Sequence, residues 1–271
     1  TVANWRQTRR IKALTQQPTE SAMPRLMLND QHWAKLKPIF VEQAIYDKPN
    51  LRLTIEAMLY RMRVGCPWRD IPPEFGRWNT LYKRYNEWSA KGIFQNIFSI
   101  LSDESDTEWI FIDGSYIKAH QHSAGAASLD QEAIGLSGGG QTTKIHLAVD
   151  AYGLPIAFEV TSGTVHDAQM ALPLMAQVED AQLVIADKGY DSQPIRDHIE
   201  STGRVSVIPR RKNSKTGNAG LDKYMYRLRH LVENMFARLK QFRAIATRYD
   251  KLKRNFVSLV ALACAFIWLP M

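Results

Sequence analysis

Residues 109–113 read Trp-Ile-Phe-Ile-Asp, a short run of apolar side chains that ends in an acid. From residue 108 onward the hydrophobic spacing changes from a helical period to one typical of strands. A second run of the same kind, Leu-Val-Ile-Ala-Asp at residues 183–187, also ends in aspartate. Apolar runs of this length indicate strands that are buried on both faces. We therefore expect an α/β domain in which Asp113 and Asp187 each terminate a buried strand.

The rest of the segment after residue 108 alternates between strand-like and helical spacing. Three further strands are predicted at residues 145–149, 156–160 and 205–208, and three helices at residues 166–178, 194–201 and 222–242. The resulting order, β-β-β-α-β-α-β-α, implies a mixed five-stranded sheet with flanking helices. The last helix carries Glu233, so a third carboxylate follows the sheet.

The segment before residue 106 has helical periodicity. Asn29 or Asp30 is a candidate N-cap for the first helix, and further helices are predicted at residues 51–64 and 78–91. A connection punctuated by prolines, residues 66–76, separates these two helices. This arrangement is typical of a helix-turn-helix, although a plain helical bundle has the same pattern. The last of the helices is aromatic and basic, and its candidate DNA contacts are Arg77, Lys83 and Arg84.

These patterns divide the chain into three segments. Residues 1–22 lack hydrophobic periodicity and do not begin with Met, so we expect a poorly ordered extension there. Residues 23–105 are predicted to form an all-α, helix-turn-helix-like DNA-binding domain, and residues 106–271 are predicted to form the α/β domain. A chain of 271 residues is long enough for two domains with separate cores.

Charge is distributed unevenly along the chain, whose formal net charge is +8. Residues 1–100 carry 16 basic and 8 acidic side chains, residues 101–200 carry 4 and 16, and residues 201–271 carry 15 and 3. Basic ends can simply be solvated surfaces, but they also favour contact with nucleic acid. The acidic middle segment can face DNA only where a bound divalent cation offsets its charge.

Simple counts argue against several classes of protein. The two cysteines, Cys66 and Cys264, stand outside any C-x-x-C spacing, so neither a zinc site nor a disulfide framework is predicted. The longest apolar run, residues 256–269, is shorter than the roughly 18 residues that a membrane span needs. No signal peptide is recognisable in the first residues, so a cytoplasmic protein is expected.

Asp113, Asp187 and Glu233 are the candidate catalytic and metal-binding residues. Two-metal phosphodiester chemistry needs oxygen ligands that converge on ions roughly 4 Å apart. Aspartates at the ends of two buried strands, with a helix that brings a glutamate against them, supply such ligands. A single aspartate at a strand end is more often a turn residue, but two in equivalent positions indicate a metal site. His166 and Asp167, at the start of a predicted helix, have two interpretations: residues next to the metal site, or, more simply, a first-turn acid at Asp167 that the helix dipole favours.

The surroundings of Glu233 strengthen this interpretation, because they fit the pattern Y-x2-R-x3-E-x6-K with Tyr226, Arg229, Glu233 and Lys240. Here the chain resembles the DDE transposases of the IS4/IS5 group, in particular its IS5-like members. Residues 112–115, Ile-Asp-Gly-Ser, match the first aspartate motif of that family, and residues 186–191, Ala-Asp-Lys-Gly-Tyr-Asp, match the second. Residues 68–72, Trp-Arg-Asp-Ile-Pro, resemble part of its helical domain. The resemblance covers about residues 23–271.

The resemblance implies an RNase H-like fold in which the strands of Asp113 and Asp187 are neighbours. It implies a DNA transposase that cleaves and transfers strands in a cut-and-paste manner with two Mg²⁺ ions, for which Mn²⁺ substitutes. The expected partner is double-stranded DNA, both the terminal inverted repeats of the element and its target, bound by a homodimer at the bacterial nucleoid. Neither a membrane nor a small-molecule substrate is expected. Two alternatives stay open: an RNase H-like nuclease without strand transfer, and a transposase-derived DNA-binding repressor.

The helix through Glu233 predicts one DNA-facing groove. At about 100° per residue, Tyr226, Arg229 and Lys240 lie within about 40° of Glu233 around the helix axis. We expect Arg229 and Lys240 to grip phosphates and Tyr226 to pack against a sugar or base. Lys188, directly after Asp187, is a further candidate phosphate contact. The alternative is a helix whose charged face simply meets water.

Overall fold

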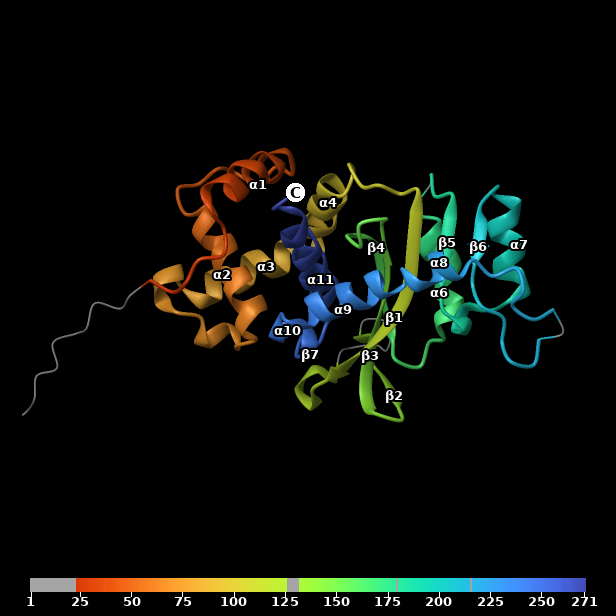
Figure 1. Cartoon of the computed structure of the whole chain (residues 1–271). Coiled ribbons are helices and arrows are strands. Elements are labelled where there is room, and N and C mark those ends of the chain that lie inside the picture. Colours follow the sequence, from red (N-terminus) through yellow and green to blue (C-terminus); the bar gives the residue numbers. More distant parts are fainter. Residues whose placement is uncertain (1–22, 126–131, 179, 215) are drawn as a thin grey trace, which may run out of the picture.

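The computed structural model describes residues 23–125, 132–178, 180–214 and 216–271, and its first part is helical (Figure 1). The predicted extension at residues 1–22 lies outside the described residues. The helices run in the order α1 (Asp30–Glu42), α2 (Leu51–Val64), α3 (Trp78–Ala90) and α4 (Ile93–Leu101). Asn29 is the N-cap of α1, because its side chain accepts a hydrogen bond from the backbone N–H of His32.

The connection between α2 and α3 contains two 3-10 turns, η1 (Trp68–Asp70) and η2 (Pro73–Phe75). It is therefore longer than the turn of about 3–4 residues that joins the helices of a helix-turn-helix. Gly65 ends α2 in the left-handed conformation, with φ +75°, as glycine commonly does at helix ends. The predicted helical region is thus present, and α2 and the basic-aromatic helix α3 are joined by an ordered, proline-rich linker.

A mixed sheet follows the helices. Its strands are β1 (Trp109–Ala119), β2 (Gly135–Ser137), β3 (Gly140–Val149), β4 (Pro155–Ser162), β5 (Leu183–Ala186), β6 (Val205–Val207) and β7 (Thr247–Arg248). The five main strands are in the order β4-β3-β1-β5-β6, with β3 antiparallel to β1 and β4, and with β5 parallel to both β1 and β6. This is the RNase H-like topology that the resemblance implied. The short strands β2 and β7 pair with β3 and β1 and enlarge the predicted five-stranded sheet to seven strands.

Helices cover both faces of the sheet. One face of β1, with Ile110 and Ile112, packs against α6 (Asp167–Met175) and α7 (Gln193–Ser201). The other face, with Phe111 and Ile117, packs against α9 (His230–Lys240) and α11 (Lys253–Trp268). Successive side chains of a strand point to opposite faces, so residues of odd number in β1 face α9. The sheet therefore brings Asp113 to the α9 side.

The helix α11 joins the helical region to the sheet. It lies beside α4 and α3 (Figure 1), and the same apolar core contains side chains from α2, α4, α9, α11 and the sheet. Phe256 and Cys264 of α11 are fully buried in this core. The domain boundary near residue 105 remains a prediction, but the core does not stop there. None of the helices that the structure describes combines the length and apolarity of a membrane span.

Several element boundaries differ from the prediction, and two of the differences affect the candidate site. Asp113 was expected to terminate its strand, but β1 continues to Ala119 because β3 pairs with it up to Lys118. Only the parallel pairing with β5 ends before Asp113. The continuous helix predicted over residues 222–242 is also wrong. It is divided into α8 (Lys223–Arg227) and α9, and a short helix α10 (Arg243–Ala246) follows.

The break between α8 and α9 lies at Leu228 and Arg229. Here the backbone hydrogen bonds span three residues: the N–H of Leu228 donates to Met225, and that of Arg229 donates to Tyr226. Such bonds tighten the chain locally into a 3-10 turn. Arg229 thereby becomes the N-cap of α9 instead of an interior residue.

Candidate active site

Asp113 and Asp187 lie next to each other at the centre of the sheet. The last pair in register between β1 and β5 is Ile112 with Ala186. Asp113 follows Ile112 within β1, and Asp187 follows Ala186 directly after the end of β5. Neighbouring strands lie about 4.8 Å apart, which sets the separation of the two backbones. Because side chains alternate along a strand, both carboxylates belong to the face that α9 covers.

Glu233 reaches this place from the first turn of α9, where Arg229 connects it to Asp113. Nη1 of Arg229 lies 3.0 Å from Oδ2 of Asp113, and Nη2 of the same guanidinium donates to Oε1 of Glu233. The fork of the guanidinium matches two carboxylates at once. Asp113 and Glu233 are 120 positions apart in the chain. The structure brings their carboxylates to the two terminal nitrogens of one guanidinium group.

The local environment disfavours charge on Asp113. Burial raises the pKa of this carboxyl above its ordinary value, and the nearby Asp187 and Asp167 add to the effect. The N–H of Gly114, which donates to Oδ1 at 2.8 Å, and the charge of Arg229 act in the opposite direction. Burial would lower the pKa of Arg229, but Asp113 and Glu233 together hold it above its ordinary value.

The chemistry of the three carboxylates fits a hard divalent cation, which prefers oxygen ligands. Among the described residues, however, no group of three or more His, Cys, Asp or Glu side chains is arranged closely enough to hold an ion. In this arrangement the guanidinium of Arg229, and not a third carboxylate, lies between Asp113 and Glu233. The three carboxylates are nevertheless of the chemical type that such an ion prefers.

Lys240 and Tyr226, the other members of the motif, lie on either side of Arg229 in the chain. Nζ of Lys240 donates to Oγ of Ser115 at 2.7 Å. The ammonium group of Lys240 therefore contacts β1 two residues after Asp113. Tyr226 is partly buried against the main core. Arg229 and Lys240 thus face the same strand, as predicted for one groove, although Tyr226 belongs to the separate helix α8.

Lys188 follows Asp187 in a 3-10 turn, η4 (Lys188–Tyr190), and its side chain is exposed. The carboxylate of Asp187 begins this turn by accepting the N–H of Gly189 at 2.7 Å. The exposed position of Lys188 is compatible with the predicted phosphate contact and with a simple loop lysine.

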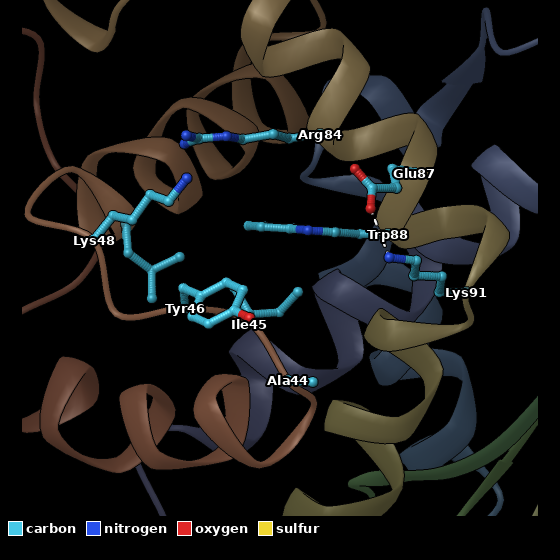
Figure 2. Close-up of a pocket in the computed structure, with 9 residues that line it drawn as sticks. Ala44, Ile45, Tyr46, Lys48, Arg84, Glu87, Trp88 and Lys91 are labelled. Carbon is cyan, nitrogen blue, oxygen red and sulfur yellow. Dashed lines mark hydrogen bonds and ion pairs between the residues drawn. The ribbon is translucent and has the colours of Figure 1, made fainter.

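The three candidate DNA contacts in the helical region differ in their surroundings. Arg77 and Lys83 are exposed. Arg84 is half-buried, because its Nη1 donates to Oγ1 of Thr54 at 2.7 Å. Figure 2 shows that Arg84 and Lys48 extend over the same pocket, which has a volume of about 260 Å³ and is lined on one side by Trp88. Of the three candidate contacts, Arg84 is therefore the one that is partly engaged within the helical region.

The sequence analysis missed a charged cluster on the opposite face of the sheet. Nζ of Lys144 lies 3.0 Å from the carboxylate of Asp167, and Nδ1 of His146 lies 3.4 Å from it. Asp167 does stand in the first turn of α6, as predicted, but its partners are on β3. Lys144 and His146 are almost fully buried. Two polar residues with a period of two in an apolar strand were the signal that indicated a common partner.

Tyr190 is the second residue that sequence reasoning missed. Its side chain is buried beneath the sheet, and its hydroxyl has no hydrogen-bond partner among the described residues. Burial, reinforced by Asp167, Asp113 and Asp187, raises its pKa well above the ordinary value. Tyr190 therefore remains a neutral donor close to the carboxylates.

Comparison with known proteins identifies both parts of the chain. Residues 104–268 match the family model described as "Transposase DDE domain", and residues 28–98 match a model of transposases of the IS4/5 family. A Brucella ovis protein assigned as the transposase for insertion sequence element IS6501 is 37% identical over 132 residues, 47% of this chain and 98% of that protein. A Burkholderia cepacia protein assigned to insertion sequence element IS402 is 29% identical over 136 residues, 46% of this chain and 62% of that protein.

Solved structures give weaker likenesses. The piggyBac transposase synaptic complex with hairpin DNA has a TM-score of 0.41 and 11% identity, over 70% of this chain and 50% of that one. The Mos1 mariner paired-end complex with Mn has a TM-score of 0.28 and 12% identity, over 93% and 80% of the two chains. The family models are the decisive finding, since the DDE model covers more than half of the chain. That family consists of enzymes that cut and transfer DNA strands with divalent metal ions, and the chain belongs to it as a DNA transposase of the IS4/5 group.

Proposed function

We propose that this transposase cleaves the strands at the ends of its own insertion sequence and joins the freed 3′-OH to target DNA, with Asp113, Asp187 and Glu233 as the ligands of two Mg²⁺ ions. The observation that carries the proposal is that β1, the end of β5 and α9 deliver three carboxylates to one face of the sheet. Carboxylate oxygens are the donors that Mg²⁺ prefers. Mn²⁺, which accepts the same ligands, substitutes for it.

The bound ions supply activation of the attacking oxygen and stabilisation of the leaving oxygen. The chain itself orients the DNA. Arg229 and Lys240 donate to phosphate oxygens beside the scissile bond, since they stand at Asp113 and Ser115 along β1. Tyr226 packs against a neighbouring sugar or base, and the exposed Lys188 reaches a further phosphate. Water or the 3′-OH attacks directly, so no covalent protein–DNA intermediate is expected.

The helical region, in this proposal, recognises the terminal inverted repeats. Arg77 and Lys83 are exposed cations on or next to α3 and are available to phosphates and base edges. Arg84 contributes from the edge of the pocket in Figure 2. A homodimer, located at the nucleoid, brings two element ends together.

The test uses the full chain and DNA that carries the terminal repeat of the element. Asp113→Ala, Asp187→Ala and Glu233→Ala should each abolish strand cleavage in Mg²⁺ and in Mn²⁺, while gel-shift binding of the DNA end is largely retained. Asp197→Ala, which removes an exposed carboxylate of α7, is the matched control and should cleave normally. Near-normal cleavage by any of the first three variants would overturn the assignment. Joining of a pre-cleaved end to a plasmid separates a transposase from a nuclease without strand transfer.

A further inference from the structure

The guanidinium of Arg229 donates hydrogen bonds to carboxylate oxygens of Asp113 and Glu233, the proposed metal ligands. At Asp113, Oδ1 accepts the N–H of Gly114 at 2.8 Å and Oδ2 lies 3.0 Å from Nη1 of Arg229. At Glu233, Oε1 accepts Nη2 of the same side chain. Both oxygens of Asp113 are therefore engaged. A divalent cation that takes Oδ2 of Asp113 and Oε1 of Glu233 competes with the guanidinium for these two oxygens.

We propose that Arg229 is an internal counter-ion that exchanges with divalent metal, and that metal binding thereby releases its guanidinium to grip a DNA phosphate. This inference rests on the proposed function, because it takes Asp113 and Glu233 as metal ligands. It adds a coupling: while the guanidinium holds two carboxylates, their negative charge repels a phosphate from the same side chain. Phosphate contact at position 229 then depends on metal loading.

The position of Arg229 in the fold allows this exchange. It is the N-cap of α9, at the 3-10 break after α8, and its side chain is 21% exposed. The side chain can therefore swing without disturbing the buried residues of α9, such as Val232 and Met235. Lys240, by contrast, bonds to the neutral hydroxyl of Ser115 and forms no ion pair with a carboxylate of the described residues, so its phosphate contact needs no such release.

Removal of the Arg229 guanidinium should raise the affinity of the site for a divalent ion. With Arg229 present, the formal charge of Asp113, Asp187, Glu233 and Arg229 is −2; without it, the three carboxylates carry −3. A cation site of more negative charge binds a divalent ion more tightly, because charges a few ångströms apart interact strongly near a protein surface. A purely structural arginine, one that holds Glu233 in place for the metal, would give weaker binding when removed.

The first experiment measures Mn²⁺ binding to the full chain without DNA, by the electron paramagnetic resonance signal of free Mn²⁺. Arg229→Ala should bind Mn²⁺ about tenfold more tightly than wild type, on the scale of one removed charge. Arg227→Ala is the matched control, since it removes an exposed arginine two residues earlier and should leave the Kd unchanged. Arg229→Gln serves if the alanine variant does not fold. Unchanged or weaker binding in the folded Arg229 variant would overturn the proposal.

Asp113→Asn separates this outcome from failure of the proposed function. If Asp113→Asn binds Mn²⁺ as wild type does, the carboxylates are not the metal site and the proposed function itself fails. If Asp113→Asn loses Mn²⁺ but Arg229→Ala gains no affinity, the metal site stands and the exchange is rejected.

The second experiment measures the coupling to DNA through the salt dependence of binding, with and without Ca²⁺ as a divalent ion that need not support cleavage. Each phosphate contact contributes about 0.9 to the slope of log K against log salt concentration for duplex DNA. On addition of Ca²⁺, the slope should become steeper by about one phosphate contact in wild type and in Arg227→Ala. Arg229→Ala should lack this increase. Equal changes of slope in all three proteins would show that metal does not release Arg229.

Discussion

Gly114 and Asp167 are packed so closely that a Cβ atom at position 114 would stand 2.0 Å from Oδ1 of Asp167. This contact places a carboxylate directly beneath the strand of Asp113, on the other face of the sheet. Asp167 is held there by Lys144, which is only 2% exposed. A buried lysine without a partner is strongly unfavourable. The contact of Gly114 with Asp167 and the ion pair of Asp167 with Lys144 therefore hold β1 at a fixed distance from α6, next to Asp113.

Gly114→Ala should damage both stability and activity. The added methyl group must push Asp167 away from Lys144 or move β1, and overpacking of this kind costs about 1–3 kcal/mol. We expect a lower midpoint of urea unfolding and a loss of strand cleavage. Gly138→Ala is the control, because a Cβ atom there meets nothing within 4 Å. A Gly114→Ala protein with wild-type stability would show that Asp167 can move freely.

Asp113→Asn should make the protein more stable at pH 7 while it abolishes cleavage. Burial raises the pKa of Asp113, so the folded chain binds its proton more readily than the unfolded chain does. The charged carboxylate then lowers stability above the folded pKa, and this penalty disappears as the pH falls below the unfolded value of about 3.9. Asparagine resembles the neutral form. Thermal unfolding in EDTA from pH 3 to pH 7 should give Tm curves that diverge as pH rises; a lower Tm for the variant at pH 7 would contradict this.

Lys240→Ala should lower cleavage without changing metal affinity. Lys240 donates to Ser115 and not to a carboxylate, so its loss displaces DNA and leaves the metal ligands intact. Misplacement of a substrate by about 1 Å can cost roughly 100-fold in rate, and we expect a loss of roughly 10–100-fold in single-turnover cleavage. Lys240→Arg should recover part of the rate. If Lys240→Ala cleaves like wild type, the basic face of α9 simply meets water.

Phe256→Ala should weaken the helical region and the sheet together. Phe256 is fully buried in α11, and truncation of a buried phenylalanine costs about 3–5 kcal/mol. Because α11 belongs to the core that both parts share, fluorescence and circular dichroism should report one common transition in urea. Tyr46→Ala, at a side chain 83% exposed, should change stability by no more than about 0.5 kcal/mol. Two separate transitions in wild type would mean that the cores are independent.

Local pattern was sufficient to predict much of this architecture. The apolar runs before Asp113 and Asp187 are strands, since side-chain periodicity is a property of neighbouring residues. That these two strands are neighbours in the sheet could not be predicted in the same way, because strand order is not encoded by local spacing. This expectation came from the family resemblance. The roles of Asp113, Asp187 and Glu233 remain proposals, although the fold does bring them to one face.

The failures of prediction have a common physical cause. The continuation of β1 beyond Asp113 is decided by its partner β3, about thirty residues later in the chain. The break at Leu228 and Arg229 occurs in a segment with good helical spacing, and the contact of Arg229 with Asp113 on β1 accompanies it. The first-turn position of Asp167 was predicted correctly, but its ion pair with Lys144 on β3 was missed. Each of these differences concerns a contact between residues distant in sequence.

The shared core has a consequence for synthesis of the protein on the ribosome. The helices of residues 30–101 emerge before α11, which completes their packing but begins only at Lys253. The nascent N-terminal helices must therefore wait with apolar surface exposed until the C-terminal helix leaves the exit tunnel. A chain that stops before residue 253 would then keep Asp113, Asp187 and Glu233 but could not complete the packing of its N-terminal helices.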